Sequence, residues 1–118
     1  MGSETSIELE GNLFSNNTGA AGPGVCVSPD ATLTSLGNNL LEDGSDSGIV
    51  DGVNGDIVGE AAMVSALADN GGFTPTHLPA PGSPAIDAIS SGECSVDADQ
   101  RGEERPAGAG GDIGSVEQ

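Results

Sequence analysis

The chain has 118 residues, of which 35% are hydrophobic and 2% aromatic, so it forms one small domain whose core must be aliphatic. Nineteen acidic residues against two arginines give a net charge of −17. That balance excludes binding to nucleic acid and to anionic membrane surfaces, both of which need clustered Lys and Arg. Twenty glycines and seven prolines predict frequent turns and few long helices.

A weak internal repeat lies in the first 42 residues. The segment 9–17 can be laid over 35–43, which places Gly11 over Gly37 at an offset of 26 residues. This period lies in the range of solenoid coils and predicts short strands. Alternation within the first strand points Ile7 and its apolar neighbours inward.

Asparagines are concentrated at the predicted turns of this repeat. They are Asn12, Asn16, Asn17, Asn38 and Asn39. Their amides suggest glycan binding, but the favoured interpretation is structural, because asparagines at corners tolerate left-handed turns and form hydrogen bonds between neighbouring coils.

Residues 43–56 form an acidic, glycine-rich loop. Its four carboxylates are candidate Ca²⁺ ligands, because calcium prefers oxygen donors. They are Asp43, Asp46, Asp51 and Asp56. The spacing matches neither an EF-hand loop nor a repeating calcium-binding nonapeptide. A solvated acidic turn that adds solubility is therefore the favoured interpretation, and a calcium site is the alternative.

Two segments predict short helical turns. The alanine-rich stretch 60–69 is expected to form one or two turns before Asn70-Gly71-Gly72 ends it. Further along, Ser83 is expected to cap a turn that begins at Pro84.

The cysteines are Cys26 and Cys94. They permit one disulfide, contributing about 4 kcal/mol in the chain-entropy model, or two free thiols. The start of the chain, residues 1–4, has no signal-peptide pattern, and we expect the chain to be a piece of a longer protein. No apolar run is long enough to span a membrane.

Arg101 and Arg105 are the two fixed cations among the nineteen acids. We predict that Arg101 holds the tail together by pairing with Asp87, Asp112 or Glu117, since a guanidinium can bind several acceptors. Recognition of an acidic ligand is the weaker alternative. The candidate polar staple comprises Arg101, Asp99, Asp87, Asp112, Glu117 and His77.

His77 is the single histidine, and no catalytic motif accompanies it. We therefore expect a hydrogen-bonded structural residue. Paired carboxylates would suit a polysaccharide-active enzyme. With two phenylalanines as the entire aromatic content, however, the chain offers little surface on which sugars could stack.

Several blocks of the sequence resemble the choice-of-anchor Q domain, the C-terminal module of secreted bacterial right-handed parallel β-helix proteins. The blocks are S-L-G-N-N-L at 35–40, N-G-G-F-T-P-T-H at 70–77, P-G-S-P-A-I-D at 81–87, D-Q-R-G at 99–102 and D-I-G at 112–114. The resemblance covers roughly residues 30–118. Many relatives carry a Cys immediately before the final Asp-Ile-Gly, where this chain departs from the pattern with Gly111.

The resemblance implies an all-β fold. Residues 1–42 would form terminal coils of a right-handed parallel β-helix, and residues 43–118 the acidic loop and a loop-rich cap with a short helical turn, in one domain. It implies a non-catalytic capping module, linked to anchoring, of a protein secreted to the bacterial cell surface. Its partner would be the upstream coils of the parent protein.

Two other functions stay open. One is a Ca²⁺-dependent module for adhesion or for binding a surface glycan or protein. The other is a fragment of a polysaccharide-active enzyme. No cofactor other than Ca²⁺ is suggested. An exposed coil edge would also allow dimerisation, because unpaired strands can pair with another copy.

Overall fold

The computed structural model describes residues 5–17, 25 and 27–118. The predictions that concern Cys26 or residues 1–4 therefore lie outside the described residues. The chain divides into two compact units, Met1–Glu60 and Ala61–Gln118. The acidic loop therefore belongs to the first unit, whereas the sequence-based division lay at residue 42.

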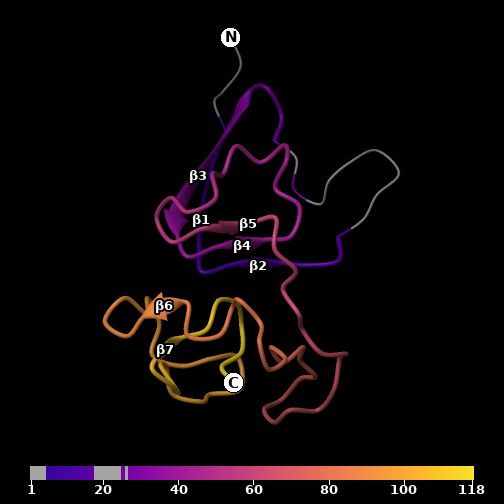
Figure 1. The fold of residues 1–118 in the computed structure, drawn as a ribbon, viewed down its shortest axis with the longest axis vertical. Helices are drawn as coiled ribbons and strands as arrows, with labels where there is room; N and C mark the ends of the chain where they lie inside the picture. The colour runs from indigo at the N-terminus through magenta and orange to yellow at the C-terminus, as the bar shows by residue number, and fades with distance from the viewer. Residues whose placement is uncertain (1–4, 18–24, 26) are drawn as a thin grey trace. The chain divides into compact units, whose positions relative to one another are not determined.

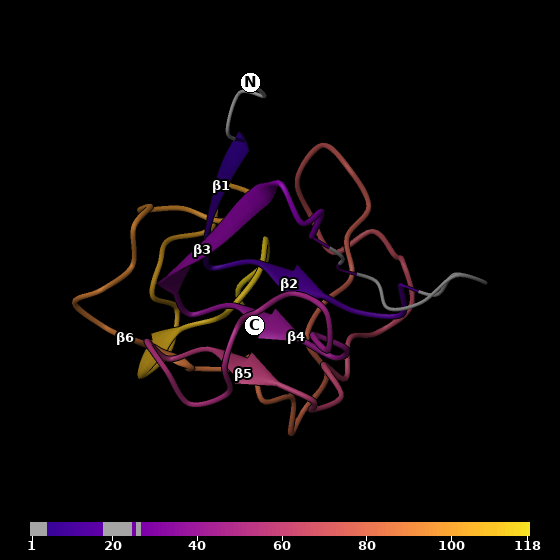
Figure 2. The ribbon, with the colours of Figure 1, turned by 90° about the horizontal axis from the view of Figure 1, so that it is seen from above.

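The first unit is built from parallel strands. Strand β1 (Thr5–Glu10) pairs with β3 (Ala31–Gly37), and β2 (Leu13–Phe14), β4 (Leu40–Leu41) and β5 (Ile57–Val58) form a second sheet in that order. Figure 1 and Figure 2 show β2, β4 and β5 side by side.

The pairing of β1 with β3 follows the internal repeat. Ile7 lies opposite Leu33, and a bulge between Leu9 and Glu10 shifts the register by one residue before β2 meets β4. The core of this unit is small and centres on the fully buried Leu40–Leu41. The prediction that Ile7 points inward is wrong: its side chain is 50% exposed, on an edge strand with no partner on its outer side among the described residues.

The second unit is loop-rich. Strands β6 (Ile89–Ser90) and β7 (Gly110–Gly111) pair antiparallel. Residues 64–79 fold back as an antiparallel arm through two isolated bridges. The buried apolar residues of this unit are Ala62, Ala85, Ile89, Ile113 and Val116.

The prediction of β-helix coils with a short helical turn is wrong. The described residues contain no helix, their strands are few and short, and three separate small sheets replace a continuous solenoid. The spacing gives one reason: Leu13 pairs with Leu40, but Leu40 pairs with Ile57 after a much shorter excursion, so the chain does not repeat full coils. No helix of the described residues could cross a membrane.

Both predicted helical turns take other forms. In the stretch 60–69, Met63 adopts a φ of 52°, which is incompatible with an α-helix. The N–H groups of Ser65 and Ala68 instead donate across the arm to the carbonyls of Leu78 and Thr76. A ten-residue helix is marginal by itself, so this pairing outweighs the helix propensity of alanine.

Ser83 does cap a turn, as its sequence context predicted, but the turn does not continue into a helix. The Ser83 hydroxyl accepts a hydrogen bond from the N–H of Ala85 at 3.1 Å and donates to the carbonyl of Ala62 at 2.5 Å. The turn then ends at Asp87, whose φ is 54°.

Candidate functional site

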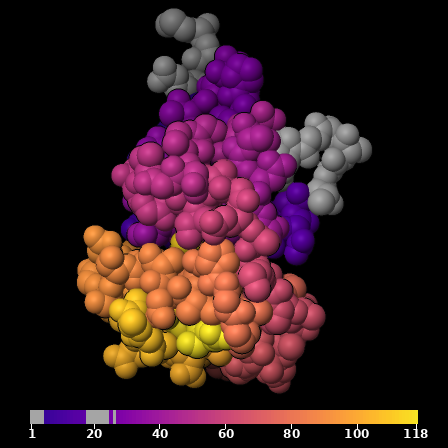
Figure 3. Space-filling model, in the orientation of Figure 1, coloured from indigo at the N-terminus to yellow at the C-terminus, as the bar shows by residue number. Residues whose placement is uncertain are grey.

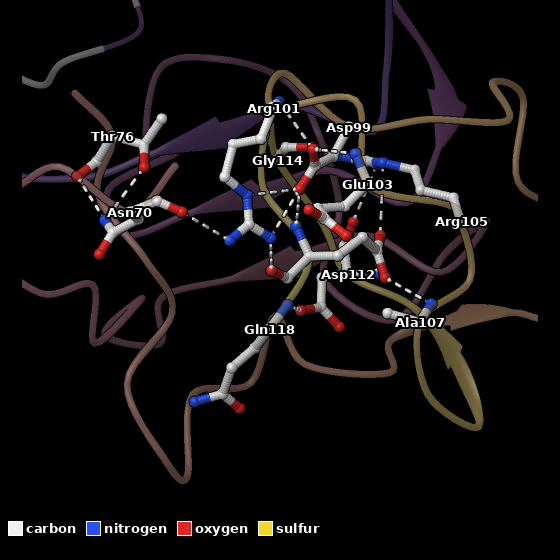
Figure 4. Close-up of polar contacts among 11 residues, drawn as sticks. Asn70, Thr76, Asp99, Arg101, Glu103, Arg105, Ala107, Asp112, Gly114 and Gln118 are labelled. Atoms are coloured by element: carbon white, nitrogen blue, oxygen red, sulfur yellow. Dashed lines mark hydrogen bonds and ion pairs between the residues drawn. The ribbon is translucent and has the colours of Figure 1, made fainter. Parts of the chain in front are cut away.

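Arg101 is bound on three sides within the second unit (Figure 4). Its Nη2 and Nε lie 2.8 and 3.0 Å from Asp99 Oδ2. Its Nη1 donates to the carbonyl of Asn70 at 3.2 Å, and Nη2 also donates to the carbonyl of Glu117. The Arg101 side chain is 14% exposed and that of Asp99 is fully buried, so this ion pair is an interior one.

Asp99 is surrounded by hydrogen-bond donors. Beyond the guanidinium, it accepts from the backbone N–H groups of Arg101 at 2.7 Å, Glu103 at 3.1 Å and Glu117 at 2.9 Å. Burial alone would raise the pKa of Asp99. The N–H of Glu117, the Arg101 guanidinium and the two other N–H groups outweigh burial and hold the pKa below its ordinary value.

A lowered pKa in the folded state has a defined pH signature. The charged form of Asp99 contributes stability above the unfolded-state pKa of about 3.9, and this contribution is lost as the pH falls from there through the folded-state pKa. We expect Asp99→Asn to be less stable than wild type at pH 7, with a difference that shrinks below about pH 4.

Urea unfolding between pH 2 and 7, in salt that screens the charge of the chain, measures this difference. Asp97→Asn is the matched control, because Asp97 is exposed and its carboxylate has no hydrogen bond among the described residues. A wild-type-to-Asp99→Asn difference that stays constant over this pH range would contradict the assignment.

Glu117 is the second centre of the network and is 1% exposed. Its Oε1 accepts from the N–H of Asp112 at 2.9 Å, and its Oε2 accepts from the N–H of Ala107 at 3.2 Å. Arg105 Nε lies 3.4 Å from Oε1, an ion pair in which this buried nitrogen makes no hydrogen bond. Arg105 Nη2 donates to the carbonyl of Gly114 at 2.6 Å.

The two remaining aspartates of the predicted staple hold backbone groups. Asp112 accepts from the N–H of Asp87 at 2.8 Å and from the N–H of Gln118 at 2.7 Å. Asp87 accepts from the N–H of Gly110 at 2.9 Å. Neither carboxylate forms an ion pair with Arg101. We call the observed cluster the carboxylate network: Asp99, Arg101, Arg105, Asp112 and Glu117.

The predicted ion-pair partner of Arg101 is therefore wrong. The sequence predicted pairing with Asp87, Asp112 or Glu117, whereas the side-chain partner is Asp99, two residues away, and Glu117 contributes its carbonyl. His77 belongs to the arm: its Nδ1 lies 2.7 Å from the carbonyl of Ser65 and its ring is exposed. The sequence did not predict that the carbonyl of Asn70 binds Arg101, because a backbone carbonyl leaves no signal in the side-chain types.

In the first unit, two of the five asparagines, Asn12 and Asn39, form side-chain hydrogen bonds between neighbouring strands. Asn12 donates from its backbone N–H and from Nδ2 to Asn39 Oδ1, at 2.9 and 3.3 Å. Asn39 donates in the same way to Asp56 Oδ1, at 2.9 and 3.1 Å. These three residues immediately precede β2, β4 and β5, and we call them the amide ladder. The ladder ends at Asp56 because a carboxylate has no donor to pass on.

Asp51 closes the outer edge of β5. The N–H groups of Ile57 and Gly59 donate to β4, so the intervening N–H of Val58 faces outward. Asp51 Oδ1 accepts this N–H at 2.8 Å. A charged side chain therefore occupies the position where a further strand would bind.

The predicted calcium ligands are thus engaged separately. Asp51 and Asp56 terminate the sheet, Asp43 accepts from the N–H and hydroxyl of Ser45 at 3.2 and 2.8 Å, and Asp46 is exposed. Among the described residues, no three Asp, Glu, His or Cys side chains gather closely enough to hold a metal ion. Figure 3 shows part of the acidic loop at the surface.

We expect millimolar Ca²⁺ to leave the thermal midpoint within about 2 °C of that in EDTA, because binding would have to pull Asp51 and Asp56 from existing hydrogen bonds. Differential scanning calorimetry at matched ionic strength, with Mg²⁺ as the control cation, measures this shift. A rise of the midpoint that is specific to Ca²⁺ would assign the acidic loop as a cation site instead.

Cys94 is half-buried beside β7 and forms no disulfide within the described residues. A Cβ added at Gly111 would lie 2.5 Å from its Sγ, so the sulfur fills the space that a side chain at 111 would take. No described residue tests pairing between Cys94 and Cys26.

No protein family, curated protein or solved structure matches this chain. The carboxylate network fixes a loop-rich unit, and the amide ladder ends at a closed strand edge.

Proposed function

We propose that the chain is a non-catalytic capping module, linked to anchoring, of a bacterial cell-surface protein. Its task is to end a parallel sheet so that the last strand does not pair with other chains. The bacterial surface location and the anchoring rest on the resemblance to the choice-of-anchor Q domain.

The observation that carries the proposal is the difference between the two edges of the β2-β4-β5 sheet. At β5, Asp51 binds the outward N–H and Asp56 ends the amide ladder. At β2, no described strand pairs with the outer edge. A sheet that is closed on one side and open on the other suits a terminal position, because unprotected edges invite aggregation.

The carboxylate network supports a structural role for the second unit. Asp99, Asp112 and Glu117 are all buried, and each carboxylate accepts at least two backbone N–H groups. Carboxylates held in this way stabilise a loop-rich fold that has little apolar core. No observation on the described residues favours calcium-dependent adhesion or polysaccharide chemistry over capping.

The contact between Cys94 and Gly111 supports the resemblance itself. Many members of the family that the chain resembles carry a Cys at the position of Gly111. The geometry places the Cys94 sulfur against that position.

Opening the closed edge tests the proposal. Asp51→Ala leaves the outward N–H of Val58 unpaired, and the β5 edge of one copy can then meet the open edge of the next. Such head-to-tail contacts do not close, so we expect association beyond the dimer. We also expect the Val58 amide to exchange at least about tenfold faster, consistent with loss of a charge-assisted hydrogen bond.

Asp43→Ala is the matched control, since it removes the same charge from the same loop and, within the described part of the chain, its carboxylate accepts hydrogen bonds only from Ser45. Analytical ultracentrifugation over a wide concentration range compares the two variants with wild type. If Asp51→Ala and Asp43→Ala associate equally and Val58 exchanges at the wild-type rate, Asp51 does not cap the sheet.

A further inference from the structure

The amide ladder has a direction. In each step the residue nearer the start of the chain donates and the next accepts: Asn12 to Asn39, and Asn39 to Asp56. Asp56 is 3% exposed, and its charged carboxylate accepts hydrogen bonds but has none to donate. At the other end, Asn12 Oδ1 accepts no hydrogen bond from the described residues.

The backbone of β2 is open on the same side. The carbonyls of Asn12 and Phe14 accept from Leu40 and Glu42, so both face β4. In a parallel ladder successive residues face opposite sides, and the N–H and C=O of Leu13 therefore face the outer edge. The open edge thus presents two acceptors and one donor, all at β2.

We propose that this open edge binds an uncharged parallel strand that carries an asparagine in register with Asn12. This inference rests on the proposed capping function and names the partner of its open side. The incoming asparagine would donate its N–H and Nδ2 to Asn12 Oδ1, as Asn12 does to Asn39. The Leu13 backbone would pair with the incoming strand.

The chain shows which side chains such a strand needs. Within the first unit, Glu8 of β1 lies opposite the uncharged Thr34. Ile7 lies opposite the apolar Leu33. An acidic residue opposite Glu8 would be repelled, because like charges directly opposite each other destabilise a sheet. Residues 31–41 of this chain have the features that such a strand needs. Asn39 would take the ladder position, an apolar residue would face Ile7, and no side chain is charged.

The test uses a capped peptide with the sequence of residues 31–41, titrated into the intact chain and followed by NMR and by amide exchange. We expect protection of the Leu13 N–H and chemical-shift changes at the Asn12 side chain. The same peptide with alanine at the position of Asn39 should bind at least about tenfold more weakly. Titration of the peptide alone controls for its self-association.

The possible outcomes separate the inference from the proposed function. Equal binding of the two peptides, or no binding at millimolar peptide, overturns the partner assignment and leaves capping to be judged by Asp51→Ala. Protection at Val58 instead of Leu13 would overturn both. Leu13 protection that grows with protein concentration in the absence of peptide would identify a second copy as the occupant and overturn the assignment of a separate strand.

Discussion

Arg101→Ala is expected to lower the free energy of unfolding by about 3–5 kcal/mol, because it leaves the carboxylate of Asp99 buried without its counter-charge. The variant also removes the donors to the carbonyls of Asn70 and Glu117. Arg101→Lys should lose less, since it retains a charge but not the planar fork that binds Asp99 through two nitrogens. Urea unfolding at neutral pH measures both variants.

Removing an arginine also makes a very acidic chain more acidic, and this effect must be separated from the loss of the ion pair. Ser95→Asp changes the net charge by the same amount at an exposed position. A second check is Arg101→Met combined with Asp99→Asn, which removes both charges, keeps an amide oxygen to accept from backbone N–H groups, and should recover part of the loss. An Arg101→Ala variant no less stable than Ser95→Asp would show that the interior ion pair is not stabilising.

Glu117→Ala is the second large effect, with an expected loss of about 3–5 kcal/mol. It leaves the buried N–H of Asp112 and the N–H of Ala107 without acceptors, and it leaves the buried Arg105 side chain without its carboxylate. Glu117→Gln should lose less, because one side-chain oxygen remains to accept from Asp112. Urea unfolding gives the size of the loss, and amide exchange at Ile113 reports the local effect.

Glu93→Ala is the control for Glu117→Ala, because Glu93 is exposed and its carboxylate has no hydrogen bond among the described residues. Exchange at Leu40, in the first unit, is recorded in the same experiment. Unchanged stability of Glu117→Ala relative to Glu93→Ala would mean that the carboxylate network does not hold the second unit.

The internal repeat predicted short strands at an offset of 26 residues, and β1 pairs with β3 at that offset as far as Leu9 and Ser35. It did not predict where the repetition stops. Strand β5 follows β4 too soon for a further coil, and this depends on how the acidic loop folds back through Asp51 and Asp56. Such side-chain-to-backbone bonds leave no periodic trace in a sequence.

The same limit explains the errors in the second unit. The alanines of 60–69 favour a helix locally, but the competing partner lies at 76–80 and is visible only once the chain folds back. Arg101 was correctly expected to bind inside the unit. Its partner could not be chosen among several nearby acids, because the choice depends on which carboxylate the backbone of Glu117 also reaches.

The interior position of Arg101 gives the chain a built-in protease reporter. Trypsin cleaves after lysine and arginine but poorly before proline, and this chain has no lysine and an Arg105-Pro106 bond. The bond after Arg101 is therefore its one good tryptic site. Cleavage there requires the guanidinium to leave Asp99 and enter the protease, so the rate of digestion of the native chain measures how often the second unit opens.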